Sequence, residues 1–324
     1  MVQEKKQIAK FHLPGLFEFY EFYQSFLPLF QEHRDWFYDW CEIASLYGAP
    51  EDCIWGGGRF GEGNVTPEEV LELVGGYGIS ARLTFSNSLI QKCHLSDLKC
   101  NQICQAFEGF GIVQNGVIVH SDILLEYLKK QYPGLYLVSS TTKVLTEFEA
   151  LKRELERDEF AYVVPDFRWN KSLEQLVQLP QSEKDKVEFL CNECCSVHCT
   201  DRRACYENVS RRILEAFEGD FQGDRENEKD SLDDNVGFTR EHICRAPGGR
   251  EGYRFSKAMS SPMFIGIEDI QKVYLPAGFS NFKIEGRGLG SAVLLEFLLY
   301  YLTKPEYQLQ VREHIYLDSM LDLF

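Results

Sequence analysis

Six cysteines lie between residues 191 and 244, and five of them fall within fifteen residues. The stretch reads Cys191-Asn-Glu-Cys194-Cys195-Ser-Val-His-Cys199-Thr-Asp-Arg-Arg-Ala-Cys205-Tyr, and Cys244 follows in His-Ile-Cys-Arg. Core cysteines scatter along a chain, because each replaces a small apolar residue wherever one fits. Ligand cysteines cluster, because a metal draws its thiolates from one short stretch and one or two distant arms. This concentration therefore indicates a metal-binding set.

Four of these thiols form the candidate ligand set. Cys195 and Cys199 are four residues apart, a spacing that would place both sulfurs on one face of a helical turn. Cys205 lies six residues further on, and Cys244 would be the distant arm. Four thiolates suit a 4Fe-4S cluster or a structural zinc ion.

Other interpretations of this stretch stay open. His198 and His242 would complete a zinc site, and buried thiols without any metal are a third alternative. Cys191 and Cys194 flank the set, and we treat both as spare.

Short β-rich apolar runs alternate with stretches of helical periodicity along the chain, a pattern typical of a parallel sheet with crossover helices. The predicted strands are Glu42–Tyr47, Ala81–Ser86, Gly111–Val119, Leu135–Ser139, Phe160–Val164, Val187–Cys191, Met263–Ile267 and Asn281–Glu285. The predicted helices open at Thr66 or span Ser121–Tyr132, Thr146–Arg157, Ser172–Leu179 and Ala292–Leu302. Eight strands that alternate with helices predict a TIM-type (β/α)8 barrel over residues 41–324, with an incomplete or distorted barrel as the variant of this fold.

Two segments fall outside this pattern. The region from Phe11 to Trp40 is rich in aromatic residues, and we expect residues 1–40 to form a helical cover for the bottom of the barrel, with a partner-binding surface as the alternative. Glu218 to Asp234 is acidic and polar, as in a flexible excursion.

Polar residues follow six of the predicted strands, where the active site of a barrel of this type would lie. Each of them would also suit a turn or a helix cap. Arg287 beside Gly286 would hold a carboxylate or phosphate through a bidentate bond. The candidate catalytic residues are Asn87, Asn115, Lys143, Asp166, Glu285 and Arg287. The loop from Gly56 to Gly63 lacks the Lys-Ser/Thr of a phosphate loop, and we expect a flexible lid or turn there.

Composition argues against several classes of partner. The net charge is −16 and no basic tract offsets it, which disfavours nucleic acid. The longest apolar run, Ala292 to Leu302, is interrupted by Glu296 and is too short to span a bilayer. Residues 1–10 lack the apolar region of a secretory signal, so we expect a cytoplasmic protein with reduced thiols.

Three motifs resemble the U-thirty-two (collagenase-like) peptidase family. Asn192-Glu-x-Cys195-x-x-x-Cys199-x-x-Arg202-x-x-Cys205-Tyr206 is similar to the family signature Asn-Glu-x-Cys-x-x-x-Cys-Pro-x-Arg-x-x-His-Tyr. Phe282-Lys-Ile-Glu-Gly-Arg287 resembles its closing motif, and Phe264-Ile-Gly-Ile-Glu-Asp-Ile270 is similar to Phe-Ile-Arg-Pro-Glu-Asp-Leu. Thr200 stands where the family has proline, and Cys205 stands where many members have histidine.

The resemblance implies a barrel that carries a 4Fe-4S cluster on Cys195, Cys199, Cys205 and Cys244. It also implies oxygen-independent hydroxylation, with prephenate as an oxygen donor. The first hypothesis is therefore an iron–sulfur hydroxylase or oxidoreductase that acts on a small molecule or a protein. Arg287 and Lys143 would hold the anionic co-substrate, and Asn87, Asn115 and Asp166 would shape the pocket.

Two other functions compete with this one. A peptidase is the runner-up, although the chain has neither a Gly-x-Ser-x-Gly elbow nor a His-Glu-x-x-His zinc helix. The third hypothesis is a non-catalytic subunit that carries the cluster and pairs with a related barrel through the aromatic N-terminal segment.

Overall fold

The computed structural model describes residues 7–58, 65–193, 195–219 and 253–318. Its eight parallel strands pair in the order β6-β5-β4-β3-β2-β1-β8-β7. A parallel bridge between Val163 and Val187 joins the two outer strands, so the sheet closes and the predicted (β/α)8 barrel is confirmed. The strands are β1 (Ala9–Pro14), β2 (Cys41–Gly48), β3 (Ser80–Phe85), β4 (Gly116–Val119), β5 (Tyr136–Ser139), β6 (Phe160–Val163), β7 (Glu188–Leu190) and β8 (Asn281–Lys283).

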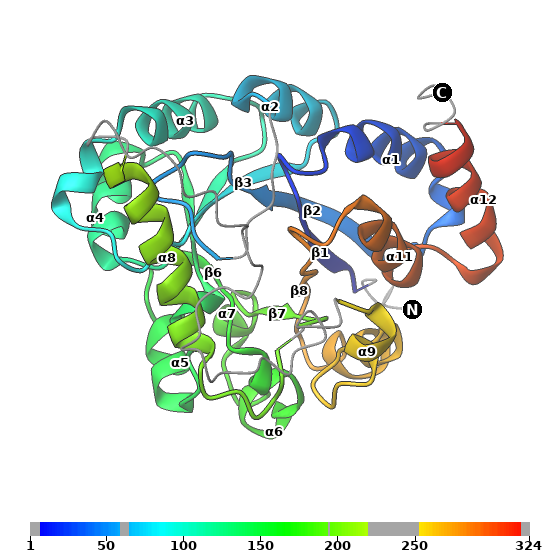
Figure 1. Cartoon of the computed structure of the whole chain (residues 1–324). Helices are drawn as coiled ribbons and strands as arrows, with labels where there is room; N and C mark the ends of the chain where they lie inside the picture. The colour runs from blue at the N-terminus through cyan, green and yellow to red at the C-terminus, as the bar shows by residue number, and fades with distance from the viewer. Residues whose placement is uncertain (1–6, 59–64, 194, 220–252, 319–324) are drawn as a thin grey trace.

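Helices follow the strands along the chain and surround them (Figure 1). The α-helices are α1 (Tyr20–Glu32), α2 (Pro67–Gly76), α3 (Leu98–Glu108), α4 (Asp122–Gln131), α5 (Phe148–Leu155), α6 (Leu173–Leu176), α7 (Gln181–Lys184), α8 (Arg202–Gly219), α9 (Phe255–Met259), α10 (Ile267–Asp269), α11 (Ser291–Tyr301) and α12 (Gln308–Glu313). Shorter 3-10 or π turns are η1 (Arg34–Trp36), η2 (Lys92–Ser96), η3 (Thr141–Lys143), η4 (Phe167–Lys171), η5 (Ile270–Tyr274), η6 (Pro305–Tyr307) and η7 (His314–Asp318). Among the described residues, no helix is long and apolar enough to cross a membrane.

The sequence signals at the helix starts act as predicted. Thr66 accepts a hydrogen bond from the Glu69 backbone N–H, and the Glu69 carboxylate accepts one from the Thr66 backbone, which closes a capping box at α2. Pro67 stands in the first turn, where its missing N–H has no cost. The helices predicted from Ser121, Thr146, Ser172 and Ala292 correspond to α4, α5, α6 and α11, and α6 is shorter than expected.

The N-terminal segment differs from the prediction. Residues 1–40 were expected to form a helical cover, but Ala9–Pro14 is a barrel strand that pairs with both β2 and β8. Its polar His12 points into the barrel interior, so the strand lacks the run of apolar residues by which the others were identified. Five of the eleven aromatic residues that follow lie on α1, which packs Phe22 and Phe26 into the main hydrophobic core.

Two other predicted strands need correction. Met263–Ile267 is not a strand: Ile265 N–H donates to Cys191 O, and the chain then turns into α10 after Gly266. The segment is apolar because Ile265 is buried in the core and Phe264 contacts Tyr300. The strand expected at Gly111–Val119 begins only at Gly116, because the preceding residues form the loop from α3.

The barrel interior is divided between apolar and charged side chains. Five residues near the carboxyl ends of the strands form a small apolar cluster, namely Tyr47, Ile118, Val138, Val164 and Leu190. A second set, formed by His12, Arg82, Glu188 and Lys283, is one buried polar network, in which Arg82 and Lys283 pair with the Glu188 carboxylate and the His12 ring lies 3.6 Å from it. Removing a charged group from water costs free energy unless the group is paired. Each charged side chain of this network therefore depends on its partner to be stable in the interior.

Candidate functional site

A small cavity lies at the carboxyl ends of the strands, the position of active sites in barrels of this type. Its volume is about 70 Å³. We call it the mouth cavity. It is lined by Tyr47, Gly58, Thr84, Ser86, Ile118, Ser140, Thr141, Thr142, Val164, Leu190, Glu193, Tyr206, Lys283, Glu285 and Arg287.

Lys283 ends β8 and contributes a buried amine to this cavity. Its Nζ lies 3.1 Å from Glu188 Oε1 and 3.4 Å from the centre of the Tyr47 ring. Burial lowers the pKa of Lys283 to about 8, although the Glu188 carboxylate opposes the change. Arg82 and Arg287 lower the pKa further, because a second positive charge nearby disfavours the ammonium form.

Arg287 is fixed by two groups from other parts of the barrel. Its Nη2 donates to Gly57 O at 2.9 Å, and its Nη1 lies 3.9 Å from Glu18 Oε1. Burial raises the pKa of Glu18 above its usual range, and Arg287 opposes the rise. Within the described part of the chain, neither carboxylate oxygen of Glu18 has a hydrogen-bond partner. Arg287 is therefore positioned by the backbone and is only loosely paired with this carboxyl group.

The glycine-rich loop after β2 forms one wall of the mouth cavity. Gly57 packs so tightly on the end of β3 that a Cβ there would lie 2.5 Å from the Ser86 carbonyl carbon. Asn87 ties the same loop down, because its Nδ2 donates to Ile54 O at 2.9 Å. The expectation of a lid or turn covered Gly56 to Gly63, of which residues 59–63 lie outside the described residues.

Hydroxyl groups line two sides of the cavity. Thr84 Oγ1 and Ser86 Oγ are buried and have no hydrogen-bond partner among the residues that the structure describes. Across from them, Thr142 Oγ1 lies 2.8 Å from His120 Nδ1. Burial lowers the pKa of His120 to about 4, with smaller effects from Lys143 and Arg203, so this ring is neutral near pH 7. The two hydroxyls on β3 are free to bind a polar ligand.

A buried arginine joins the acidic side of the cavity to α8. Arg202, at the start of α8, places its Nη1 2.5 Å from Glu193 Oε2 and its Nε 3.3 Å from Asp166 Oδ2. Its guanidinium also lies 4.8 Å from the centre of the Phe167 ring. Asp166 follows β6 and Glu193 follows β7, so one side chain connects two strand ends with the helix that carries Cys205.

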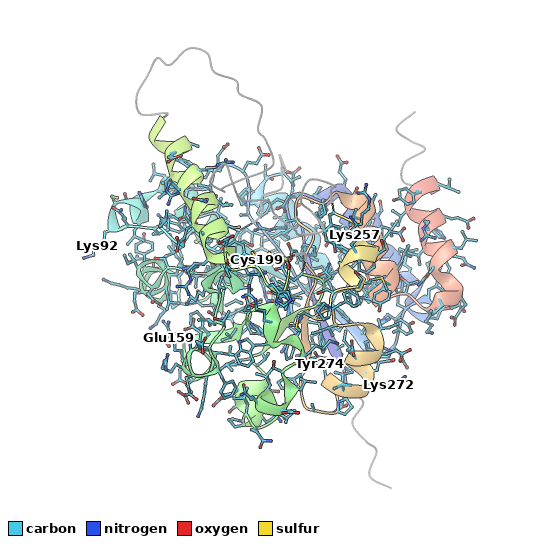
Figure 2. The ribbon with its side chains drawn as sticks, turned by 60° about the horizontal axis from the view of Figure 1, so that its bottom comes forward. Lys92, Glu159, Cys199, Lys257, Lys272 and Tyr274 are labelled. Carbon is cyan, nitrogen blue, oxygen red and sulfur yellow. The ribbon has the colours of Figure 1, made fainter. Side chains whose placement is uncertain are left out.

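The described cysteines of the candidate ligand set are close in sequence to two residues that line the mouth cavity, since Glu193 precedes Cys195 by two residues and Tyr206 follows Cys205. Cys195 and Cys199 are in the loop between β7 and α8, and Figure 2 shows Cys199 near the base of α8. The helical turn predicted for Cys195 and Cys199 is wrong, because α8 begins only at Arg202. Arg168 holds the loop in place by donating to Val197 O and Cys199 O, and Glu193 Oε1 accepts from Cys195 N. Arg168 thus binds loop carbonyls that in a helix would accept from backbone N–H groups.

The metal-ligand prediction falls partly outside the structure. Cys194, Cys244 and His242 are not among the described residues, and Cys195, Cys199 and Cys205 are partly exposed. In the described ranges, no three His, Cys, Asp or Glu side chains converge as ligands of one metal ion. The thiols suit iron or zinc chemically. Their placement does not form a complete ligand set, so we derive no chemical step through a metal.

The structure brings some of the six predicted catalytic residues to the cavity. Arg287 and Glu285 line it, and Asp166 reaches it through Arg202. Asn87 does not line the cavity, but its side chain binds the backbone of the loop after β2, which forms one side of it. Lys143 does not line the cavity, and its Nζ lies 2.5 Å from Glu154 Oε1.

Asn115 lies at the other end of the barrel. It precedes β4, and its side chain binds the backbone of Ala81, Phe107 and Phe110.

Sequence reasoning did not select Lys283, Glu18 or His120. Lys283 stands inside the Phe282-Lys-Ile-Glu-Gly-Arg287 motif, and a lysine at the end of an apolar strand was a signal that could have identified it. His120 directly follows β4, but the end of that strand was uncertain. Glu18 lay in the segment that we interpreted as a cover, so no strand end pointed to it.

Comparisons with known proteins give one structural likeness. No protein-family model and no curated protein matches the chain. The structure is similar to that of the U32 peptidase Mk0906, with 14% sequence identity and a TM-score of 0.46. The alignment covers 88% of this chain and 94% of that one.

Proposed function

We propose that the chain is an oxidoreductase whose barrel mouth binds a small carboxylate-bearing molecule. The observation that carries the proposal is that Arg287 and Lys283 line the same cavity as the hydroxyls of Thr84 and Ser86, which have no hydrogen-bond partner among the described residues. A guanidinium binds a carboxylate through two parallel hydrogen bonds, and hydroxyl groups complete the shell. The cavity of about 70 Å³ accommodates one end of a ligand, such as one carboxyl group of prephenate.

The chain's own residues have distinct tasks in this proposal. Arg287 binds the carboxylate, and the contact from Gly57 O fixes its orientation. Thr84 and Ser86 donate hydrogen bonds to the ligand. The Arg202–Glu193 pair holds α8 against the cavity, so that the cysteine loop and the binding site keep a fixed relation.

The redox part of the proposal is a 4Fe-4S cluster on Cys195, Cys199, Cys205 and Cys244. Such a cluster supplies one-electron transfer when bound. Two features of the loop support this choice. Arg168 donates to the Cys199 carbonyl, and Arg202 lies within electrostatic range of Cys195, so two cationic side chains stand beside the loop that would hold the cluster. The described thiols of the set are partly exposed, whereas Cys41, Cys53, Cys100, Cys104 and Cys191 are buried.

The metal part is tested by anaerobic purification of the full chain, followed by iron, sulfide and zinc quantification. We expect about four irons and four sulfides per chain. Cys195→Ser, Cys199→Ser, Cys205→Ser and Cys244→Ser should each lower the iron content. Cys93→Ser is the matched control, because Cys93 is exposed and lies outside the cluster. One zinc without iron, or no metal at all, would contradict the redox assignment.

The binding part is tested separately by calorimetric titration with malonate, a small dicarboxylate that is chemically inert. Arg287→Gln should weaken binding about tenfold or more, because a charged hydrogen-bonded contact is worth about 1.5–3 kcal/mol. Arg312→Gln is the control, since Arg312 pairs with Glu296 on the surface. Equal affinity in all three proteins would show that Arg287 is not the carboxylate site.

A further inference from the structure

We infer that the Lys283 amine is a covalent site, which forms an imine with the aldehyde or ketone carbon of a small oxo-carboxylate held by Arg287. This inference rests on the proposed carboxylate site and adds a bond to it. The ligand class is a short acid whose carbonyl carbon lies close to its carboxyl group.

Placement is the first argument. Lys283 is the last residue of β8, and both it and Arg287 line the mouth cavity. Lys283 is only 6% exposed, so water competes poorly at its amine. The short loop of Ile284, Glu285 and Gly286 connects the two cations, and Arg287 is among the charges that act on Lys283. A ligand that spans the two groups therefore needs to be short.

Protonation is the second argument, because only the neutral amine attacks a carbonyl carbon. Burial lowers the pKa of Lys283 to about 8, so a substantial fraction of the amine is neutral in mildly alkaline solution. The remaining charges around it stay paired when it loses its proton. Glu188 keeps Arg82, whose Nη1 lies 2.5 Å from Glu188 Oε2.

The bond changes balance without any oxidant or reductant. The neutral Lys283 nitrogen forms a bond to the carbonyl carbon, the electron pair of the C=O bond moves to oxygen, and that oxygen takes one of the two amine protons. A second proton, from solvent, lets the hydroxyl of this adduct leave as water, while the nitrogen lone pair forms the C=N bond and the other amine proton stays on nitrogen. A protonated imine has the same charge as the ammonium that it replaces, so Glu188 at 3.1 Å serves both.

The hydroxyl groups give the adduct its partners. Thr84 Oγ1 and Ser86 Oγ are buried on β3 and its end, with no partner among the described residues. They can donate to the adduct hydroxyl or to the ligand carboxylate. The volume of about 70 Å³ corresponds to about two water molecules, which limits the buried part of the ligand to a few atoms. Glyoxylate is the smallest probe with the required groups.

The test is reductive trapping on the full chain. The protein is incubated with glyoxylate near pH 8, reduced with cyanoborohydride, and analysed by intact mass and peptide mapping. We expect one added carboxymethyl group on Lys283, and malonate should suppress it. Lys283→Arg keeps a cation beside Glu188 but has no amine that forms an imine, so it should lose the adduct. Arg287→Gln should lower the labelling rate about tenfold or more.

Lys186→Arg is the matched control. Lys186 is also partly buried, but it lies at the amino end of β7, where its Nζ donates to Leu155 O and Arg157 O. This variant should label like the wild type. Labelling spread over surface lysines, or labelling of Lys283 that malonate does not suppress, would overturn the inference. If malonate binds and nothing is trapped on Lys283, the imine is wrong and the carboxylate site stands. If malonate does not bind, the proposed carboxylate site is itself wrong.

Discussion

Arg82 on β3 and Glu188 on β7 meet across the interior of the barrel, with 2.5 Å between Nη1 and Oε2. Their strands are not neighbours in the sheet, so this pair spans the barrel. Both side chains are fully buried, and Arg82 also donates to the Tyr136 hydroxyl at 2.6 Å. Pairing of this kind offsets the cost of removing both charges from water, and it leaves either partner costly to remove alone.

Arg82→Met should lower the free energy of unfolding by about 3–5 kcal/mol, because it leaves Glu188 buried with weaker partners. Urea denaturation measures the change. Lys129→Ala is the control, since Lys129 pairs with Glu126 on the surface, where solvent screens the charges, and its loss should change the stability far less. A loss in Arg82→Met as small as that of the control would contradict the assigned role.

His12 should make the protein less stable in mild acid. Burial lowers its pKa to about 3, with Arg82 acting in the same direction, whereas an unfolded histidine has a pKa near 6.5. Between these values the unfolded chain binds more protons than the folded one, so stability falls as pH falls below about 6.5. From pH 7 to pH 5 this contribution is about 2 kcal/mol. His12→Asn should flatten this part of the profile, and an unchanged profile would contradict the prediction.

Glu18 should make the protein less stable as pH rises, which is opposite to the effect of His12. Burial raises its pKa, so the folded protein keeps a proton there that the unfolded chain has lost, and stability falls as pH rises through the folded pKa. Glu18→Gln should remove this loss. Equal pH profiles for wild type and variant would contradict the prediction.

The barrel could be predicted from the sequence because most of its strands are apolar runs between helices. Seven of the predicted strands coincide with β2 to β8. β1 could not be found this way, because its inward residue is His12, which belongs to a network with Arg82, Glu188 and Asn281. That network joins residues from four strands, and no local pattern reveals it.

The candidate site was predictable only where a strand end was located correctly. Arg287, Glu285 and Asp166 follow β8 and β6, whose positions were right, and they are at or beside the mouth cavity. The spacing of Cys195 and Cys199 suggested a helical turn, but Arg168 binds the loop carbonyls and holds a different conformation. Such a long-range contact lies beyond what residue spacing can indicate.

Asn115 can show whether a residue at the amino ends of the strands takes part in ligand binding. Its Oδ1 accepts from Ala81 N at 2.9 Å, and its Nδ2 donates to Phe107 O at 2.9 Å, at the amino end of β4. Asn115→Ala leaves these buried backbone groups without partners and should lower the free energy of unfolding by about 1–3 kcal/mol. Malonate affinity of the folded protein should stay unchanged, because this end of the barrel lies opposite the mouth cavity. Asn208→Ala on the outer surface of α8 is the control and should change stability by less than about 0.5 kcal/mol. Weaker malonate binding by folded Asn115→Ala, at wild-type stability, would instead place Asn115 in the binding site and contradict the division between the two ends of the barrel.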